Sequence, residues 1–185
     1  MSSKFCLIVV GKLKNQHIQA LEQEYLKRLK SALPIYEVKS HGDNIKSEEN
    51  EIKNKIQSLS KSTNPNIVLL SEHGQLMNTK EFASFVSKQQ LKPQETFFII
   101  GGSQGFQKSF FNETHLQLSL SPMIFPHKLA RLIFVEQFYR AELCRNKIQQ
   151  DNLEDKFKKL DIESRDRSAD PGAWNRKINK EYREE

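Results

Sequence analysis

Short apolar runs that alternate with segments of helical period constrain the fold of this chain more than any other feature. Residues 5–10 (FCLIVV), 67–70 (IVLL) and 96–100 (TFFII) are almost entirely apolar. Such continuous runs are typical of strands buried on both faces of a sheet. Residues 35–38 and 116–120 alternate apolar and polar side chains and indicate two more strands. We therefore predict an α/β fold with a largely parallel sheet.

The segments between these runs have the period of helices. Helices are expected over residues 15–33, after the N-caps Ser47 and Thr79, near residues 108–113, and over residues 127–148. The helix after Ser47 is expected to be exposed, since its apolar stripe is narrow. Pro126 marks the start of the last and longest helix, because proline favours the first turn.

Charge is distributed unevenly along the 185 residues. The chain has 29 Lys and Arg against 23 Asp and Glu, a net charge of +6. Residues 151–185 contain nine basic and ten acidic residues, which leaves an excess of +7 in residues 1–150. We predict a main domain over residues 1–150 and a mostly helical extension over residues 151–185. The basic balance of the main domain favours an anionic partner such as nucleic acid.

Several classes of protein do not fit the sequence. The apolar run at residues 5–10 is too short for a signal peptide or a membrane span. The two cysteines, Cys6 and Cys144, cannot form a disulfide framework, and no Cys-x-x-Cys or His-x-x-x-His pair suggests a zinc site. We expect a soluble, cytoplasmic protein without a metal.

A glycine-rich loop, Gly101-Gly102-Ser103-Gln104-Gly105, follows the strand at residues 96–100 directly. Open α/β sheets bind ligands at the carboxyl ends of their strands, where glycine allows close approach to the backbone. A dinucleotide-binding fingerprint would need glycine where Ile100 stands and an acidic residue where Ser121 stands. The loop therefore indicates either a ligand site of another kind or a tight turn without a ligand.

A second loop, residues 120–127, carries Met123, Ile124 and Phe125. Exposure of such side chains costs about 25 cal/mol per Å², so they should cover either a flat ligand such as adenine or the protein core. The following helix carries Arg131 and Arg140, whose nine-residue separation directs them to opposite sides. No Gly-x-Ser-x-Gly elbow surrounds Ser103, which argues against hydrolase chemistry.

Three linked motifs resemble one known family. Residues 97–105 (FFIIGGSQG), residues 118–127 (LSLSPMIFPH) with Arg131, and residues 136–141 (EQFYRA) are similar to the large-subunit (23S) rRNA pseudouridine N3-methyltransferases of the SPOUT superfamily. The N-terminal VVGKLK and YLKRL segments are similar as well. The resemblance covers roughly residues 4–145. It implies a SPOUT fold with a C-terminal trefoil knot, and a homodimer that builds the site in this knot.

The resemblance also implies a cofactor and a substrate. S-adenosylmethionine would contact Leu70, Gly101 and the run Leu120, Ser121, Pro122, Met123, Ile124 and Phe125. The substrate would be a pseudouridine of large-subunit rRNA, presented in an assembled ribosome. Arg140 is the candidate for stabilising negative charge at N3 of that base, because a guanidinium stays protonated. His127, Lys128 and Arg131 are candidates for RNA contact.

The C-terminal end departs from the family pattern. The family places a short tail with Tyr-His and a basic residue soon after Tyr-Arg-Ala, whereas Ala141 is followed here by Glu142-Leu143-Cys144-Arg145. Tyr182, as a catalytic residue, and Arg183, as an RNA-binding residue, could replace that tail; an unrelated extension is the alternative. Two other functions stay open: an RNA- or ribosome-binding protein without catalysis, and a SPOUT methyltransferase with another RNA target.

Overall fold

A computed structural model describes residues 4–30 and 32–169, with side chains up to Lys147 and at Lys158. The chain divides into two compact units, Met1–Arg145 and Asn146–Glu185. The first unit contains the sheet. The second consists, in its described part, of helix. The predicted domain boundary after residue 150 stays a prediction.

Five parallel strands form one sheet in the order β2-β1-β4-β3-β5. The α/β class and the parallel sheet are therefore confirmed. The strands are β1 (Phe5–Val10), β2 (Ile35–Val38), β3 (Asn66–Leu76), β4 (Thr96–Ile100) and β5 (Leu116–Ser119). The helices are α1 (Gln16–Arg28), α2 (Ile45–Leu59), α3 (Thr79–Leu91), α4 (Lys108–Phe111) and α5 (His127–Ala169).

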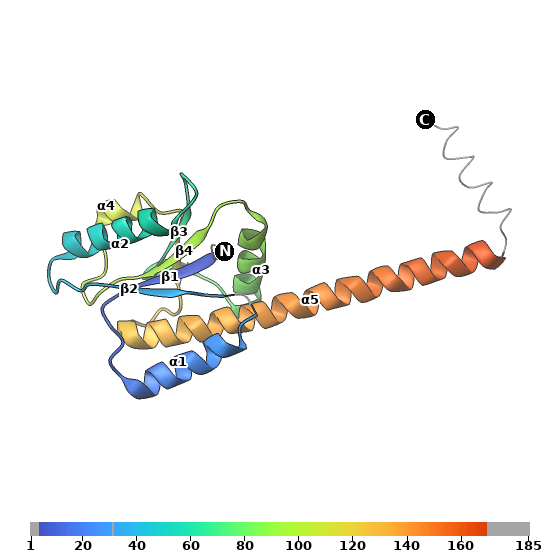
Figure 1. Ribbon diagram of the computed structural model, residues 1–185, viewed down its shortest axis with the longest axis horizontal. Helices are drawn as coiled ribbons and strands as arrows, with labels where there is room; N and C mark the ends of the chain where they lie inside the picture. Colours follow the sequence, from blue (N-terminus) through green and yellow to red (C-terminus); the bar gives the residue numbers. More distant parts are fainter. Residues whose placement is uncertain (1–3, 31, 170–185) are drawn as a thin grey trace. The chain divides into compact units, whose positions relative to one another are not determined.

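Helices cover both faces of the sheet in the first unit (Figure 1). On one face, Phe82 of α3 and Phe134 and Phe138 of α5 pack against Phe98 of β4, and α1 joins the same cluster. On the other face, Ile52 of α2 packs in a cluster with α4 and the alternate residues of the central strands. Both faces are buried because successive side chains of a strand point in opposite directions.

Three local predictions were wrong. Helix α2 is not an exposed helix: Ile52 and Ile56 are buried, and so are Glu48 and Glu49 at its start. Its N-cap is Asn44 rather than Ser47, as asparagine caps helices as well as serine does. Asn78, not Thr79, caps α3 and forms a capping box with Glu81.

Helix α5 is longer than predicted. It begins at His127 as expected, but it continues to Ala169 instead of ending near Ile148. No proline or glycine occurs between Pro126 and Pro171, so no residue interrupts the helical backbone over this stretch. The last part of the predicted extension, residues 170–185, lies outside the described residues.

Strand β3 leaves its partner strand for a short distance. Leu118 of β5 is in register with both Leu70 and Gln75 of β3, so residues 71–74 form an excursion without partners in β5. A Cβ atom on Gly74 would lie 2.6 Å from the carbonyl carbon of Leu118. Only glycine therefore allows the end of this excursion to return to β5 so closely.

Candidate cofactor pocket

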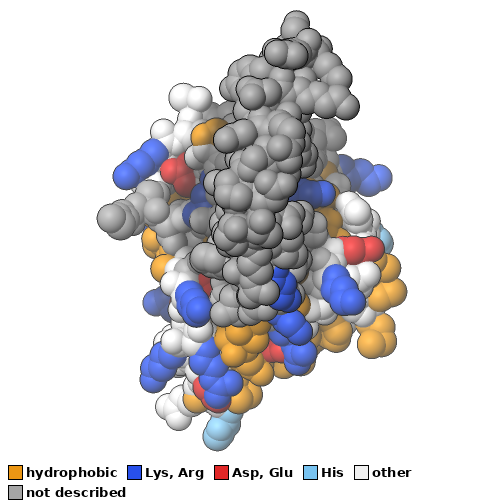
Figure 2. Space-filling model, turned by 90° about the vertical axis from the view of Figure 1, so that its right-hand side faces the viewer, with side chains coloured by type: hydrophobic (Ala, Val, Ile, Leu, Met, Phe, Trp, Pro, Cys, Tyr) orange, Lys and Arg blue, Asp and Glu red, His pale blue; other side chains and the backbone are white. Residues whose placement is uncertain are grey.

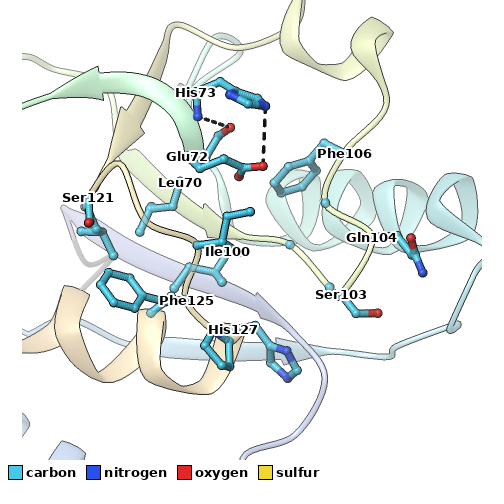
Figure 3. Close-up of a pocket in the computed structure, with 18 of the residues that line it drawn as sticks. Leu70, Glu72, His73, Ile100, Ser103, Gln104, Phe106, Ser121, Phe125 and His127 are labelled. Carbon is cyan, nitrogen blue, oxygen red and sulfur yellow. Dashed lines mark hydrogen bonds and ion pairs between the residues drawn. The ribbon is translucent and has the colours of Figure 1, made fainter.

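A cavity of about 860 Å³ opens at the carboxyl ends of β3, β4 and β5 (Figure 3). This size lies within the range of small-molecule sites, and ligands of open parallel sheets bind at this edge. It is lined by a middle part of β3, by the end of β4 and the loop that follows, by the loop after β5 and by the start of α5: Leu70, Ser71, Glu72, His73, Ile100, Gly101, Gly102, Ser103, Gln104, Gly105, Phe106, Lys108, Phe111, Leu120, Ser121, Met123, Ile124, Phe125, Pro126, His127 and Ala130.

The glycine loop forms one wall, and two of its glycines leave no space for a side chain. A Cβ atom on Gly101 would lie 2.9 Å from the ring of Phe106, and one on Gly102 would lie 2.5 Å from Oε2 of Glu48. Gly105 has a φ of +69°, which favours glycine, and its N–H donates to the carbonyl of Gly102 at 3.2 Å. The loop is therefore a compact turn that presents backbone to the cavity.

The buried carboxylates at the start of α2 hold two loops in place. Glu48 Oε1 accepts hydrogen bonds from the hydroxyl of Ser40 and the N–H of His41, both at 2.8 Å. Glu49 accepts from the N–H of Gln107 at 2.7 Å. Buried carboxylates are tolerated only with such donors. Helix α2 thus ties the loop after β2 to the end of the glycine loop, a role that the sequence analysis did not predict.

The loop between β5 and α5 forms another wall. The hydroxyl of Ser119 donates to the carbonyl of Ser121 at 2.8 Å, and the N–H of Met123 donates to the hydroxyl of Ser121 at 3.0 Å. Met123 and Ile124 are 68% and 77% exposed. Core packing, one of the two explanations for this apolar loop, is therefore wrong for these two side chains, which line the cavity.

Arg131 does not lie on the surface. Its guanidinium donates to both carboxylate oxygens of Glu22 in α1, at 2.8 Å from Nη2 to Oε1, and Nη1 donates to Glu37 at 2.7 Å. The side chains of Arg131 and Glu22 are 8% and 1% exposed. The prediction that Arg131 contacts RNA is therefore wrong for this structure, because its guanidinium is buried and donates to Glu22 and Glu37.

This ion-pair cluster perturbs two pKa values. Burial alone would lower the pKa of Arg131, but hydrogen bonds to Glu22 and Glu37 outweigh it, so the pKa is raised. Burial alone would raise the pKa of Glu37, but hydrogen bonds from the N–H of Leu13 and from Arg131 lower it. The three charges join α1, β2 and α5, and Arg131 directly follows Ala130, which lines the cavity.

Arg140 lies on the opposite side of α5, as its spacing from Arg131 predicted. Its side chain is 59% exposed and pairs with Glu136 one turn earlier. The hydrogen bond to Glu136 raises the pKa of Arg140, which keeps the guanidinium protonated. Arg140 does not line the described cavity of its own chain.

The structure brings together most of the predicted cofactor residues. Leu70, Gly101 and the run from Leu120 to Phe125 line one cavity, except for Pro122. Of the candidates for RNA contact, His127 lines the same cavity, and Lys128 is half-buried beside it in sequence. Tyr182 and Arg183 lie outside the described residues.

The cavity is also lined by Glu72, His73, Phe106 and Lys108, which were not predicted as site residues. Their position directly after predicted strands or next to the glycine loop was the available signal. In the part of the chain that the structure describes, no group of three or more His, Cys, Asp or Glu side chains could hold a metal ion. No helix among the described residues is long and apolar enough to cross a membrane.

Comparisons with known proteins agree with this geometry. The family model described as "Predicted SPOUT methyltransferase" matches residues 3–149. The chain is 35% identical to "Ribosomal RNA large subunit methyltransferase H" of Coprothermobacter proteolyticus, over 75% of this chain and 91% of that protein. It is 40% identical to the protein of the same name from Prochlorococcus marinus, over 76% and 90%.

A solved structure is similar in fold. The probable methylase family protein of Haemophilus influenzae superposes with a TM-score of 0.51 at 13% identity, over 80% of this chain and 70% of that chain. At this identity the likeness concerns the fold alone. The family model and the relatives, which span most of the chain, decide the family. This chain belongs to the SPOUT methyltransferases.

Proposed function

We propose that this protein transfers a methyl group from S-adenosylmethionine to large-subunit ribosomal RNA. The observation that carries the proposal is the meeting of Leu70, Gly101 and the loop after β5 in one cavity. Relatives that are named ribosomal RNA large subunit methyltransferases cover about three quarters of the chain. The basic excess of residues 1–150 supports an RNA partner.

The residues of the cavity fit this cofactor. The apolar side chains of Leu70, Ile100 and Phe125 suit the flat face of adenine, and the crowded glycines leave backbone groups as its polar partners. When bound, S-adenosylmethionine supplies a methyl group on a positively charged sulfonium. The chain's own part is to hold the donor and the target base in line and to exclude water.

The specific target in this proposal is N3 of a pseudouridine, which loses a weakly acidic imide proton. Arg140 stabilises the negative charge that develops there, since its guanidinium stays protonated. His127 and Lys128, at the cavity edge and next to it in sequence, contact the RNA backbone. On the side of the molecule drawn in Figure 2, which faces away from the start of α5, lysine and arginine side chains lie among hydrophobic and some acidic ones.

A homodimer is part of the proposal because Arg140 lies away from the cavity of its own chain. Leu129 and Leu143 are 41% and 49% exposed and lie on the same side of α5 as Arg140, by the helical repeat. An exposed apolar face suits a second copy, which would bring Arg140 to the partner's cavity. Sedimentation of the full chain tests the homodimer. A monomer at micromolar concentration would contradict the proposal that Arg140 completes the cavity of a second copy.

We also propose that Tyr182 and Arg183 complete the site in place of the family's tail. The proposal further includes a trefoil knot, a cytoplasmic location and the assembled ribosome as substrate. Tyr182→Phe and Arg183→Ala in the full chain test the tail. Both variants should bind S-adenosylmethionine normally and methylate ribosomes more slowly. Unchanged methylation by both would assign the extension another role.

The deciding experiment maps modified nucleotides in large-subunit rRNA from cells with and without the gene. Loss of one methyl group on a pseudouridine is expected, and its return when the gene is restored is the control. The altered sequence after Ala141 favours one alternative, an RNA-binding protein without catalysis. Calorimetry with S-adenosylmethionine distinguishes this alternative from the methyltransferase, because absence of binding would exclude the enzyme function.

A further inference from the structure

Glu72 is the only acidic side chain among the described residues that line the cavity. The other ionisable side chains there are His73, Lys108 and His127. S-adenosylmethionine carries one net positive charge, since its sulfonium adds to an amino acid that is neutral overall. The product S-adenosylhomocysteine has lost the sulfonium charge. A lone carboxylate in the wall therefore meets a cation before methyl transfer and a neutral molecule afterwards.

The backbone places Glu72 in the wall by a defined device. Glu72 belongs to the excursion of residues 71–74, where β3 leaves the register of β5. The hydroxyl oxygen of Ser119 lies 3.4 Å from the carbonyl oxygen of Glu72, and Gly74 closes the excursion against the backbone of Leu118. Irregular strand segments of this kind redirect side chains, often beside active sites.

The surroundings of the carboxylate favour interaction with a ligand cation. The side chain of Glu72 is 42% exposed, and its ion-pair partner in the described structure is the His73 ring, 3.7 Å away and 83% exposed. Figure 3 shows the Glu72 carboxylate turned toward the ring of Phe106, with the apolar Leu70 and Ile100 on the same side of the cavity. Apolar walls strengthen a charge interaction because they exclude water from it.

We infer that Glu72 makes the cavity discriminate between the charged methyl donor and its neutral product. The inference rests on the proposed function, because it requires the cavity to bind S-adenosylmethionine. Glu72 is a specificity-determining residue of the binding site that favours the loaded donor and eases product release. A merely structural glutamate would change the affinity for both ligands alike.

Calorimetry on the full chain tests this with three ligands: S-adenosylmethionine, S-adenosylhomocysteine, and sinefungin, which carries an ammonium group in place of the methyl sulfonium. Glu72→Gln removes the charge and keeps the shape. It should weaken binding of the two cationic ligands by about fivefold, the size of a partly exposed charge pair, and leave S-adenosylhomocysteine unchanged. Glu72→Asp keeps the charge and should retain most of the discrimination.

Glu113→Gln is the matched control, because it removes one negative charge from a partly exposed glutamate outside the cavity. It should leave all three affinities unchanged. Equal weakening of the three ligands by Glu72→Gln, or no weakening, overturns the inference alone. If the wild-type chain binds none of the three, the proposed function fails and the inference fails with it. Thermal unfolding of each variant checks that it is folded.

Discussion

Replacement of Arg131 by methionine should destabilise the protein strongly, because the buried carboxylate of Glu22 would lose its cation. The side chain of Glu22 is 1% exposed and receives two hydrogen bonds from Arg131. Removal of one partner of a buried ion pair costs about 3–5 kcal/mol. Glu37 adds less, since its side chain is 30% exposed and water can replace the guanidinium.

The loss should be visible as a fall in the midpoint of thermal unfolding. A chain of this length changes its Tm by about 2–4 °C per kcal/mol, so Arg131→Met should lower the Tm by about 10 °C. Circular dichroism during heating and urea titration measure it. Arg28→Met is the control and should leave the Tm almost unchanged, because Arg28 is exposed and pairs only with the exposed Glu24 in the same helix.

A second variant identifies the cause. Glu22→Gln in the Arg131→Met chain removes the unpaired charge and should recover part of the lost stability, which a double-mutant cycle measures. RNA affinity per folded molecule should remain at the wild-type level in Arg131→Met. A Tm within about 2 °C of wild type, together with a large loss of RNA affinity, would refute the buried cluster and return Arg131 to the RNA interface.

Three further predictions concern the loops around the cavity and the same charge cluster. Gly102→Ala should lower the free energy of unfolding by about 1–3 kcal/mol, since its Cβ would lie 2.5 Å from Glu48 Oε2. Urea titration should show that this effect is coupled to that of Glu48→Ala, and additive effects would contradict the contact. Gly74→Ala should cost at least as much, because it meets the backbone of Leu118 instead of a side chain; wild-type stability would mean that the excursion is not held against β5. Because the pKa of Glu37 is lowered in the folded state, its contribution is present above the ordinary glutamate pKa of about 4.3 and is lost as pH falls below it. The stability difference between wild type and Glu37→Gln should therefore shrink from pH 7 to pH 4, and a growing difference would contradict this sign.

Much of the sheet could be predicted from the sequence. The runs at residues 5–10 and 96–100 have the observed boundaries, because a strand buried on both faces must be apolar throughout. The burial of helix α2 could not be predicted in the same way. Two isoleucines one turn apart, Ile52 and Ile56, are a weak pattern in sequence, but α2 packs directly on the sheet and buries both.

The candidate site was predicted less evenly. Gly101 and the run after Leu120 were identified through motifs and family resemblance, and they line the cavity. Glu72 was not: it follows the predicted strand at residues 67–70, but its place in the wall also depends on a register shift between β3 and β5, which forms only in the folded sheet. Arg131 was assigned to the surface, since its partners Glu22 and Glu37 are far from it in the chain.

The sequence alone determined the class of fold and the edge of the sheet where a ligand can bind, because both depend on local periodicity and on the order of strands and glycines. It also separated the basic main part of the chain from the nearly neutral last 35 residues. Only the tertiary structure decided which charges are buried and which line the cavity. Charge pairs such as Arg131 with Glu22, and the placement of Glu72, form between residues that only folding brings together.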